Sequence, residues 1–202
     1  MILLDLTEKL SKKFSLFISE NTEKSNEEML KIEYGVNIIL SNVIKLPILF
    51  IIAYVFGVLK ETSIFFISLA TLRIAASGIH AETTIGCMLE TLIIFIGGAF
   101  LGIYFPLSEG VRVCIFLGSM IIIFLFAPAD TAEKPLVSKK LRRRLKIAAL
   151  TITLCLFCIT FVVKGYINKS LITYAVLIES VLITPIAYKL LNRPYRNYLR
   201  YR

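Results

Sequence analysis

The sequence contains a single histidine, His80, among 202 residues. One imidazole is too few for the common histidine-based metal centres. The chain also lacks a glycine-rich phosphate-binding loop after a strand and a serine elbow between a strand and a helix. These absences argue against metal, nucleotide and serine-hydrolase chemistry, and we expect no cofactor.

Charged residues are also scarce, at 18% of the chain, whereas 57% of the residues are hydrophobic. This balance is far more apolar than that of soluble domains. Several runs reach the roughly 20 residues that cross a bilayer. We therefore predict an all-α integral membrane protein with one membrane domain over residues 1–202. The six expected transmembrane helices cover residues 34–59, 62–78, 84–105, 111–127, 145–163 and 171–191.

The first 26 residues have no apolar run long enough for a span. On a helix, Leu3, Leu6, Leu10, Phe14 and Phe17 share one face, and the charged residues fall largely elsewhere. This pattern predicts an amphipathic helix in the cytoplasmic interface. A polar linker over residues 20–28 then joins it to the first span, and residues 192–202 form a basic cytoplasmic tail.

The basic residues gather in three segments that share one side of a six-span topology. Five lysines precede the first span, and four arginines lie in the C-terminal tail. The positive-inside rule therefore predicts that both termini and the turn between spans two and three are cytoplasmic. The basic loop expected at residues 128–144 favours anionic lipid over nucleic acid, because membrane spans flank it. The basic residues of this loop, together with Lys146 just after it, are Lys134, Lys139, Lys140, Arg142, Arg143, Arg144 and Lys146.

His80 and Cys87 lie seven residues apart at that turn. An imidazole is the usual activator of a thiol nucleophile. On an unbroken helix the two side chains would be separated by two turns, or roughly 10 Å, beyond hydrogen-bond reach. A working pair therefore requires the chain to turn between them, for which the polar residues 81–84 are suited. The alternative is an interfacial histidine beside a cysteine that only packs.

Of the remaining cysteines, Cys114 is expected toward the outer side of the membrane, away from His80, and Cys155 and Cys158 are interpreted as small, buried packing residues. Cys155 and Cys158 form a C-x-x-C pattern, but it lies in an apolar span without the βαβ context of a redox motif. Three glycines in the third span predict close helix packing: Gly97, Gly98 and Gly102.

Three blocks of residues carry a resemblance to a known family. G-I-H-A at residues 78–81 is followed by Cys87, with Arg73 upstream. A second block, A-P-A-D-T-A-E-K-P-L, occupies residues 127–136, and an earlier one, Y-G-V-N-I-I-L-S-N, occupies residues 34–42. Together they resemble the accessory gene regulator B (AgrB) family over essentially the whole chain. One difference is that Ser77-Gly78 stands where many members have two glycines.

The resemblance implies a membrane cysteine endopeptidase of bacterial quorum sensing, located in the bacterial cell membrane. Such an enzyme cuts the C-terminal segment from an AgrD-like precursor peptide and helps to form a cyclic thiolactone or lactone. His80 and Cys87 would be the catalytic pair, acting through a thioester. The implied partners are the precursor and a bilayer with anionic lipid, and a homodimer is a further possibility.

Other residues are candidates for supporting roles. Arg73 and Glu90 could pair across spans two and three, because charges at membrane depth seek partners. An orienting group for the pair could come from Asn42, Ser77, Glu82 or Asp130, and Gly78 shapes the turn. An acidic precursor tail could be held by Lys134, Lys139, Lys140, Arg142 and Arg143.

Two other classes of protein remain open. A small transporter or channel is suggested by Lys45, Glu90 and Glu179 within apolar spans, and it would not need a thiol at position 87. A receptor or adaptor would bind the peptide without releasing a product.

Overall fold

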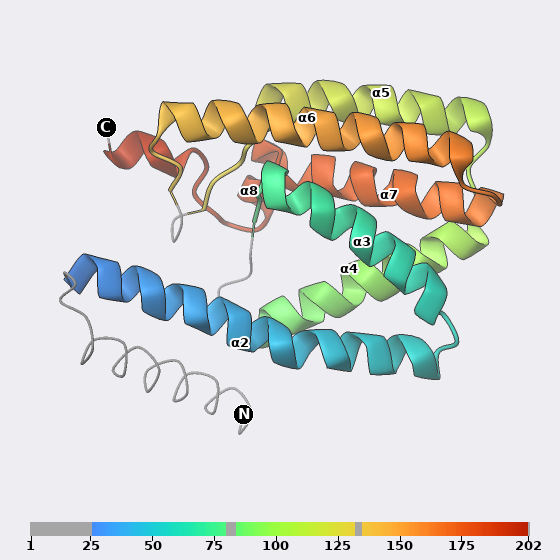
Figure 1. The fold of residues 1–202 in the computed structure, drawn as a ribbon, viewed down its shortest axis with the longest axis horizontal. Helices are drawn as coiled ribbons and strands as arrows, with labels where there is room; N and C mark the ends of the chain where they lie inside the picture. Colours follow the sequence, from blue (N-terminus) through green and yellow to red (C-terminus); the bar gives the residue numbers. More distant parts are fainter. Residues whose placement is uncertain (1–25, 80–83, 132–134, 202) are drawn as a thin grey trace.

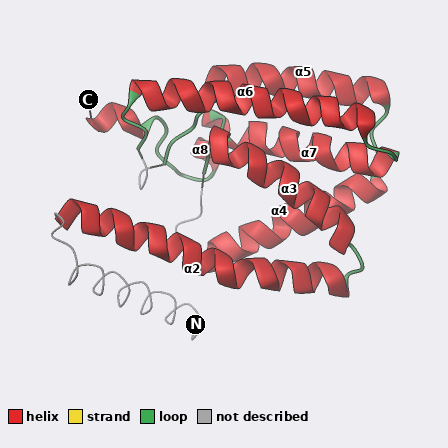
Figure 2. Cartoon of the chain, viewed as in Figure 1, coloured by secondary structure: helices red, strands yellow, loops and turns green. Residues whose placement is uncertain are grey.

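The computed structural model describes residues 26–79, 84–131 and 135–201. Regular structure in these residues is helical throughout, which confirms the predicted all-α class (Figure 2). The predicted N-terminal amphipathic helix lies outside the described residues. The helices are α2 (Asn26–Val55), α3 (Leu59–Ala76), α4 (Thr84–Tyr104), α5 (Glu109–Phe126), α6 (Lys139–Val162), α7 (Tyr166–Leu182), α8 (Pro185–Leu190) and a 3₁₀-helix (Asn197–Tyr201).

The helices α3 and α7 pack against each other at the centre of the bundle (Figure 1). Helices α5 and α6 cover one side of this pair, and α4 and α2 lie on the other side. Glycines bring α4 close to the centre: a Cβ at Gly98 would lie 2.4 Å from Phe65, and one at Gly102 would lie 2.4 Å from Leu171. Close packing is thus confirmed for these two glycines. It is wrong for Gly97, where no described atom lies within 4 Å of such a Cβ.

Large apolar side chains cover the outside of the bundle, and small polar ones are found inside it. Ile74 and Val162 are exposed, as are Ile93 and Phe124, whereas Thr153 and Ser180 are buried. This distribution suits a hydrocarbon surrounding rather than water. Within the described ranges, three helical segments are long and apolar enough to cross a membrane: Gly86–Tyr104, Glu109–Phe126 and Lys139–Val162.

Several predicted boundaries are wrong. The sixth expected span is not one helix, because α7 ends at Leu182 and Thr184 caps the separate helix α8 by accepting from the Ala187 amide at 3.3 Å. Pro185 occupies the first turn of α8, where its missing N–H is tolerated. The basic loop is also shorter than expected. Helix α6 begins at Lys139 under a Ser138 cap, so residues 139–144 are helical. Likewise, α2 already begins at Asn26, inside the expected linker.

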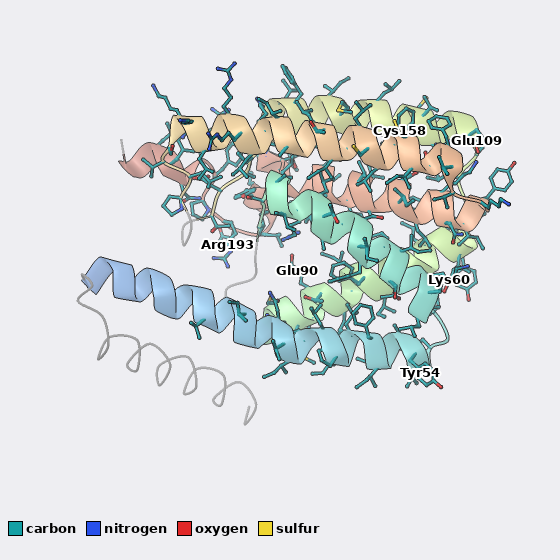
Figure 3. All side chains as sticks on the ribbon, viewed as in Figure 1. Tyr54, Lys60, Glu90, Glu109, Cys158 and Arg193 are labelled. Atoms are coloured by element: carbon teal, nitrogen blue, oxygen red, sulfur yellow. The ribbon has the colours of Figure 1, made fainter. Side chains whose placement is uncertain are left out.

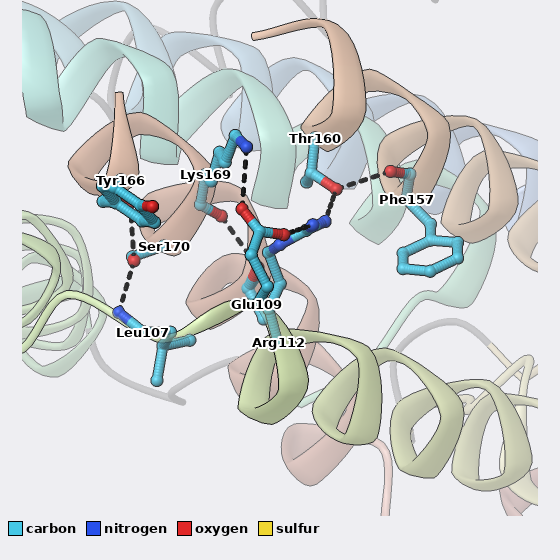
Figure 4. Close-up of polar contacts among 9 residues, drawn as sticks. Leu107, Glu109, Arg112, Phe157, Thr160, Tyr166, Lys169 and Ser170 are labelled. Atoms are coloured by element: carbon cyan, nitrogen blue, oxygen red, sulfur yellow. Dashed lines mark hydrogen bonds and ion pairs between the residues drawn. The ribbon is translucent and has the colours of Figure 1, made fainter. Parts of the chain in front are cut away.

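A buried arginine ties α5, α6 and α7 together at the end of the bundle where α7 begins (Figure 4). Arg112 is only 1% exposed, and its guanidinium contacts Glu109 and Thr160. Lys169 of α7 donates to the other Glu109 oxygen at 2.8 Å. A charge this deeply buried requires such partners, so the cluster fixes the three helices relative to one another.

Candidate active site

A cavity of about 340 Å³ lies among α2, α3 and α4. Its polar lining includes Lys45 from α2, Arg73 from α3, and Cys87 and Glu90 from α4; Asn42 also borders it. Glu90 extends from α4 into the region between α2 and α3 (Figure 3). Apolar residues such as Phe66 and Phe95 form the remaining wall. The cavity therefore combines a thiol, two cations and a carboxylate in apolar surroundings.

Cys87 sits near the start of α4 and contacts a charged side chain from another helix. The Lys45 Nζ donates to the Cys87 Sγ at 3.1 Å, and Lys45 is only 9% exposed. The Cys87 carbonyl accepts from the Thr91 hydroxyl at 2.7 Å within α4. This contact was missed by the sequence analysis, although a lysine in an apolar span signals that a partner is needed.

Two separate helices flank the chain segment that contains His80, and Cys87 lies in the second of them. Helix α3 ends at Ala76 and α4 begins at Thr84. His80 itself lies outside the described residues, as does Glu82. The separation of the two helices removes the two-turn spacing that an unbroken helix would impose on the pair.

The segment after α3 has an unusual backbone. Ser77 has φ 58° and ψ −158°, and Gly78 has φ 143°. The first conformation is populated almost only by glycine. Beside this segment runs the second motif, because Ser77 and Ala129 form a parallel bridge and the Ala129 amide donates to the Ala76 carbonyl at 2.9 Å. The two separated sequence motifs thus meet directly.

Arg73 connects this segment to the central helix α7. Its Nη1 lies 3.2 Å from the Glu179 Oε2, and its Nη2 donates to the Ile79 carbonyl. The prediction that Arg73 pairs with Glu90 is wrong. Within the described residues, Arg73 forms its ion pair with Glu179 instead. Glu179 is fully buried, and a Cβ at Gly78 would lie 3.6 Å from its other oxygen. Sequence analysis noted this acid but did not assign it to the site.

Asp130 lies in a different environment from the cavity that holds Cys87. Its carboxylate accepts backbone N–H bonds from Leu136, Asn197 and Tyr198, at 3.4, 3.0 and 2.7 Å. The Tyr188 hydroxyl also donates to its carbonyl at 2.8 Å. Asp130 therefore anchors the C-terminal segment to the second motif, and these bonds give it a positioning role rather than contact with the thiol.

The basic residues form a second, smaller cavity of about 280 Å³ at the N-terminal end of α6. Arg142 is held in place there, because it stacks over the Tyr198 ring at 3.8 Å and donates to the Leu136 carbonyl at 3.0 Å. Lys139, Lys140 and Arg143 are exposed, whereas Lys134 lies outside the described residues. Arg143, Lys146 and Arg196 join Arg142 in lining this cavity.

The other three cysteines lie away from both cavities. Cys114, Cys155 and Cys158 are all exposed on α5 and α6 (Cys158 in Figure 3), so the expectation that Cys155 and Cys158 are buried packing residues is wrong. Cys87, which is half-buried, is the cysteine that shares the first cavity with charged groups.

These features define an all-helical protein of the membrane class, with a partly buried thiol beside a cation in a cavity among three helices. The chain belongs to the accessory gene regulator B (AgrB) family, whose model matches residues 7–184. Three apolar helices and the family together indicate a membrane protein. Membership also assigns the chain a role in the accessory gene regulator system, in association with the AgrD precursor, and suggests peptide processing.

Relatives match along nearly their full length. A protein of Clostridium acetobutylicum described as AgrB-like is 36% identical over 194 residues, which is 96% of this chain and 93% of the relative. An AgrB-like protein of Listeria innocua is 37% identical over 187 residues, or 92% of each chain. The accessory gene regulator protein B of Staphylococcus aureus is 26% identical over 175 residues, covering 87% of this chain and 92% of its own. No solved structure matches.

Proposed function

We propose that this chain is a membrane-embedded cysteine endopeptidase that cuts the C-terminal segment from an AgrD-like precursor. It then promotes closure of the remaining peptide into a thiolactone or lactone ring. The observation that carries the proposal is the position of Cys87, whose sulfur faces a buried lysine in a cavity among three helices. A thiol that only packed against neighbouring helices would not require a charged partner.

The proposed reaction has two steps. The Cys87 thiolate attacks the peptide carbonyl carbon, the carbon–nitrogen bond breaks, and the leaving amine takes a proton from His80. A thioester between Cys87 and the peptide remains. A thiol or hydroxyl within the peptide then attacks the thioester, gives its proton to His80, and releases the thiolate of Cys87. A recessed cavity favours this internal attack over attack by water.

The proposed arrangement in the membrane has six spans, with both termini and the site on the cytoplasmic side. The charge bias of the sequence supports this orientation. Anionic lipid and an acidic precursor tail are the proposed partners of the basic residues at the start of α6. Exposed lysines and arginines there would steer a tail of opposite charge toward the cavity.

The test is precursor cleavage by the full chain in nanodiscs, followed by mass spectrometry of the peptide. Cys87→Ala and His80→Ala each should abolish cleavage, because the nucleophile and the group that transfers its protons act as a unit. Matched controls are Cys114→Ala, Cys155→Ala and Cys158→Ala, which remove exposed thiols that do not line the cavity and should leave cleavage intact. Robust cleavage by Cys87→Ala would overturn the proposal.

A further inference from the structure

Lys45 is buried where a lysine is hard to accommodate. It lies in the apolar half of α2, beside Pro47 and the fully buried Leu49, and is 9% exposed. A lysine in such surroundings requires a partner for its ammonium group. The partner that the described residues provide is the sulfur of Cys87, 42 positions along the chain and 3.1 Å away.

The other charged groups around the same cavity are Arg73 from α3 and Glu90 from α4. Arg73 is already paired with Glu179. Glu90 shares the cavity, but the hydrogen bond that the structure gives to the Lys45 Nζ goes to the thiol. A neutral thiol is a weak acceptor, whereas a thiolate opposite an ammonium is a charge-assisted pair.

We propose that the Lys45 ammonium is the counter-ion that holds Cys87 as a thiolate before the substrate arrives. The inference deepens the proposed function, because it takes Cys87 as the nucleophile. During attack, the sulfur's electron pair forms the bond to the carbonyl carbon, and Lys45 keeps its protons throughout. His80 then protonates the leaving amine, and it is not needed to ionise the thiol. Lys45 touches the reacting sulfur and is thus a catalytic residue in this scheme.

The test measures the reactivity of Cys87 toward iodoacetamide, without any precursor. The full chain carries Cys114→Ala, Cys155→Ala and Cys158→Ala, so that Cys87 is the single thiol, and it is held in nanodiscs. The quantity is the alkylation rate at pH 7 divided by the rate at pH 9.5. An unassisted thiol gives a ratio of a few per cent, because few such thiols are ionised at neutral pH. We expect a ratio above about 0.3 for Cys87, because a neighbouring cation favours the thiolate.

Three variants then assign the effect. Lys45→Met should lower the ratio at least about fivefold, whereas Lys45→Arg, which keeps the cation, should change it less than about twofold. Lys60→Met removes an exposed lysine at the start of α3 and is the matched control, with no expected change. His80→Ala should also keep the ratio, since the thiolate would be held without the imidazole.

Several results would overturn the inference. They are an ordinary ratio in the parent chain, an unchanged ratio in Lys45→Met, or a loss that follows His80→Ala instead. An equal fall at both pH values in Lys45→Met would mean that Lys45 only controls access to the cavity, and would also reject it. Because no peptide is used, the result is independent of the proposed function. If the parent chain fails to cut the precursor but shows the Lys45-dependent ratio, the proposed peptidase activity is contradicted, whereas the role of Lys45 as counter-ion to Cys87 is supported.

Discussion

Arg73 and Glu179 form an ion pair of 3.2 Å across 106 positions of the chain. The same guanidinium donates to the carbonyl of Ile79, the residue that precedes His80. Glu179 is fully buried in α7, so its only route to a countercharge within the described residues is this arginine. The pair therefore connects the central helix of the bundle to the chain that leads into the proposed catalytic histidine.

Breaking this pair should destabilise the protein and impair cleavage. Glu179→Leu alone leaves the guanidinium without its partner and should lower the free energy of unfolding by about 3–5 kcal/mol. Adding Arg73→Met should restore much of the stability but not cleavage, because this second change also removes the bond from the guanidinium to the Ile79 carbonyl. Thermal unfolding and precursor cleavage in nanodiscs measure the two effects. Glu90→Gln, at the carboxylate that lines the Cys87 cavity, is the control for stability. Additive effects of Glu179→Leu and Arg73→Met on stability would contradict a coupled pair.

A glycine in place of Ser77 should make the protein more stable. Its φ of 58° and ψ of −158° belong to a region that side chains other than glycine rarely occupy. Ser77→Gly is expected to raise the free energy of unfolding by about 1 kcal/mol, because the strain of the side chain is removed. Gly78→Ala is the opposite control and should destabilise, since φ at Gly78 is 143°. Equal thermal midpoints for both variants and the parent chain would contradict this view of the turn.

The exposed basic residues at the start of α6 should act on precursor binding, and Arg142 should act on structure. Neutralising Lys139, Lys140 and Arg143 together should raise KM and flatten the salt dependence of cleavage. The reason is that these exposed charges attract the acidic tail, and salt screens that attraction. The single-turnover rate at saturation should change little. Kinetics in neutral-lipid nanodiscs at several salt concentrations provide the measurement.

Arg142→Gln is the matched comparison for this cluster. It removes the stacking on Tyr198 and the bond to the Leu136 carbonyl, so it should lower the thermal midpoint instead. If cleavage by the triple variant and by the parent chain has the same salt dependence, Lys139, Lys140 and Arg143 only anchor the protein to anionic lipid.

The two ends of α6 should face opposite sides of the membrane. This helix has 24 residues, or roughly 36 Å, which is long enough to cross the hydrocarbon core. Asn168 lies in the first turn of α7, just beyond the C-terminal end of α6, and Ser138 caps the N-terminal end of α6. In a cysteine-free chain, Asn168→Cys should react with a membrane-impermeant maleimide on intact cells. Ser138→Cys should react only after permeabilisation. Labelling of Ser138→Cys from outside would invert the proposed topology and move the site to the external face.

Long apolar runs made most of the helices predictable, and the seven-residue spacing of His80 and Cys87 made the break between α3 and α4 predictable too. The partners of the buried charges were not predictable in the same way. Arg73 had acids within reach on two expected helices, and the choice of Glu179 over Glu90 depends on α3 packing against α7. Periodicity shows which face of a helix is apolar but not which neighbour covers it.

The division between α7 and α8 was missed for a local reason. Thr184 and Pro185 lie within an apolar run, and hydropathy alone does not separate one long helix from two short ones. The threonine cap and the proline in the first turn of α8 were visible in the sequence as a signal for a new helix. The basic loop was overestimated likewise, since Ser138 was a cap for the charged start of α6.

The bonds made by Asp130 have a consequence for how the protein is made. Residues 45, 73 and 87 leave the ribosome well before Glu179 and the amides of Asn197 and Tyr198. Until then, Arg73 has no countercharge from α7 and Asp130 has no tail to hold. Although earlier helices can enter the bilayer as they are translated, the turn before His80 gains its full support only after these later residues have been translated. A nascent or truncated chain would thus carry the thiol without the finished surroundings that direct it.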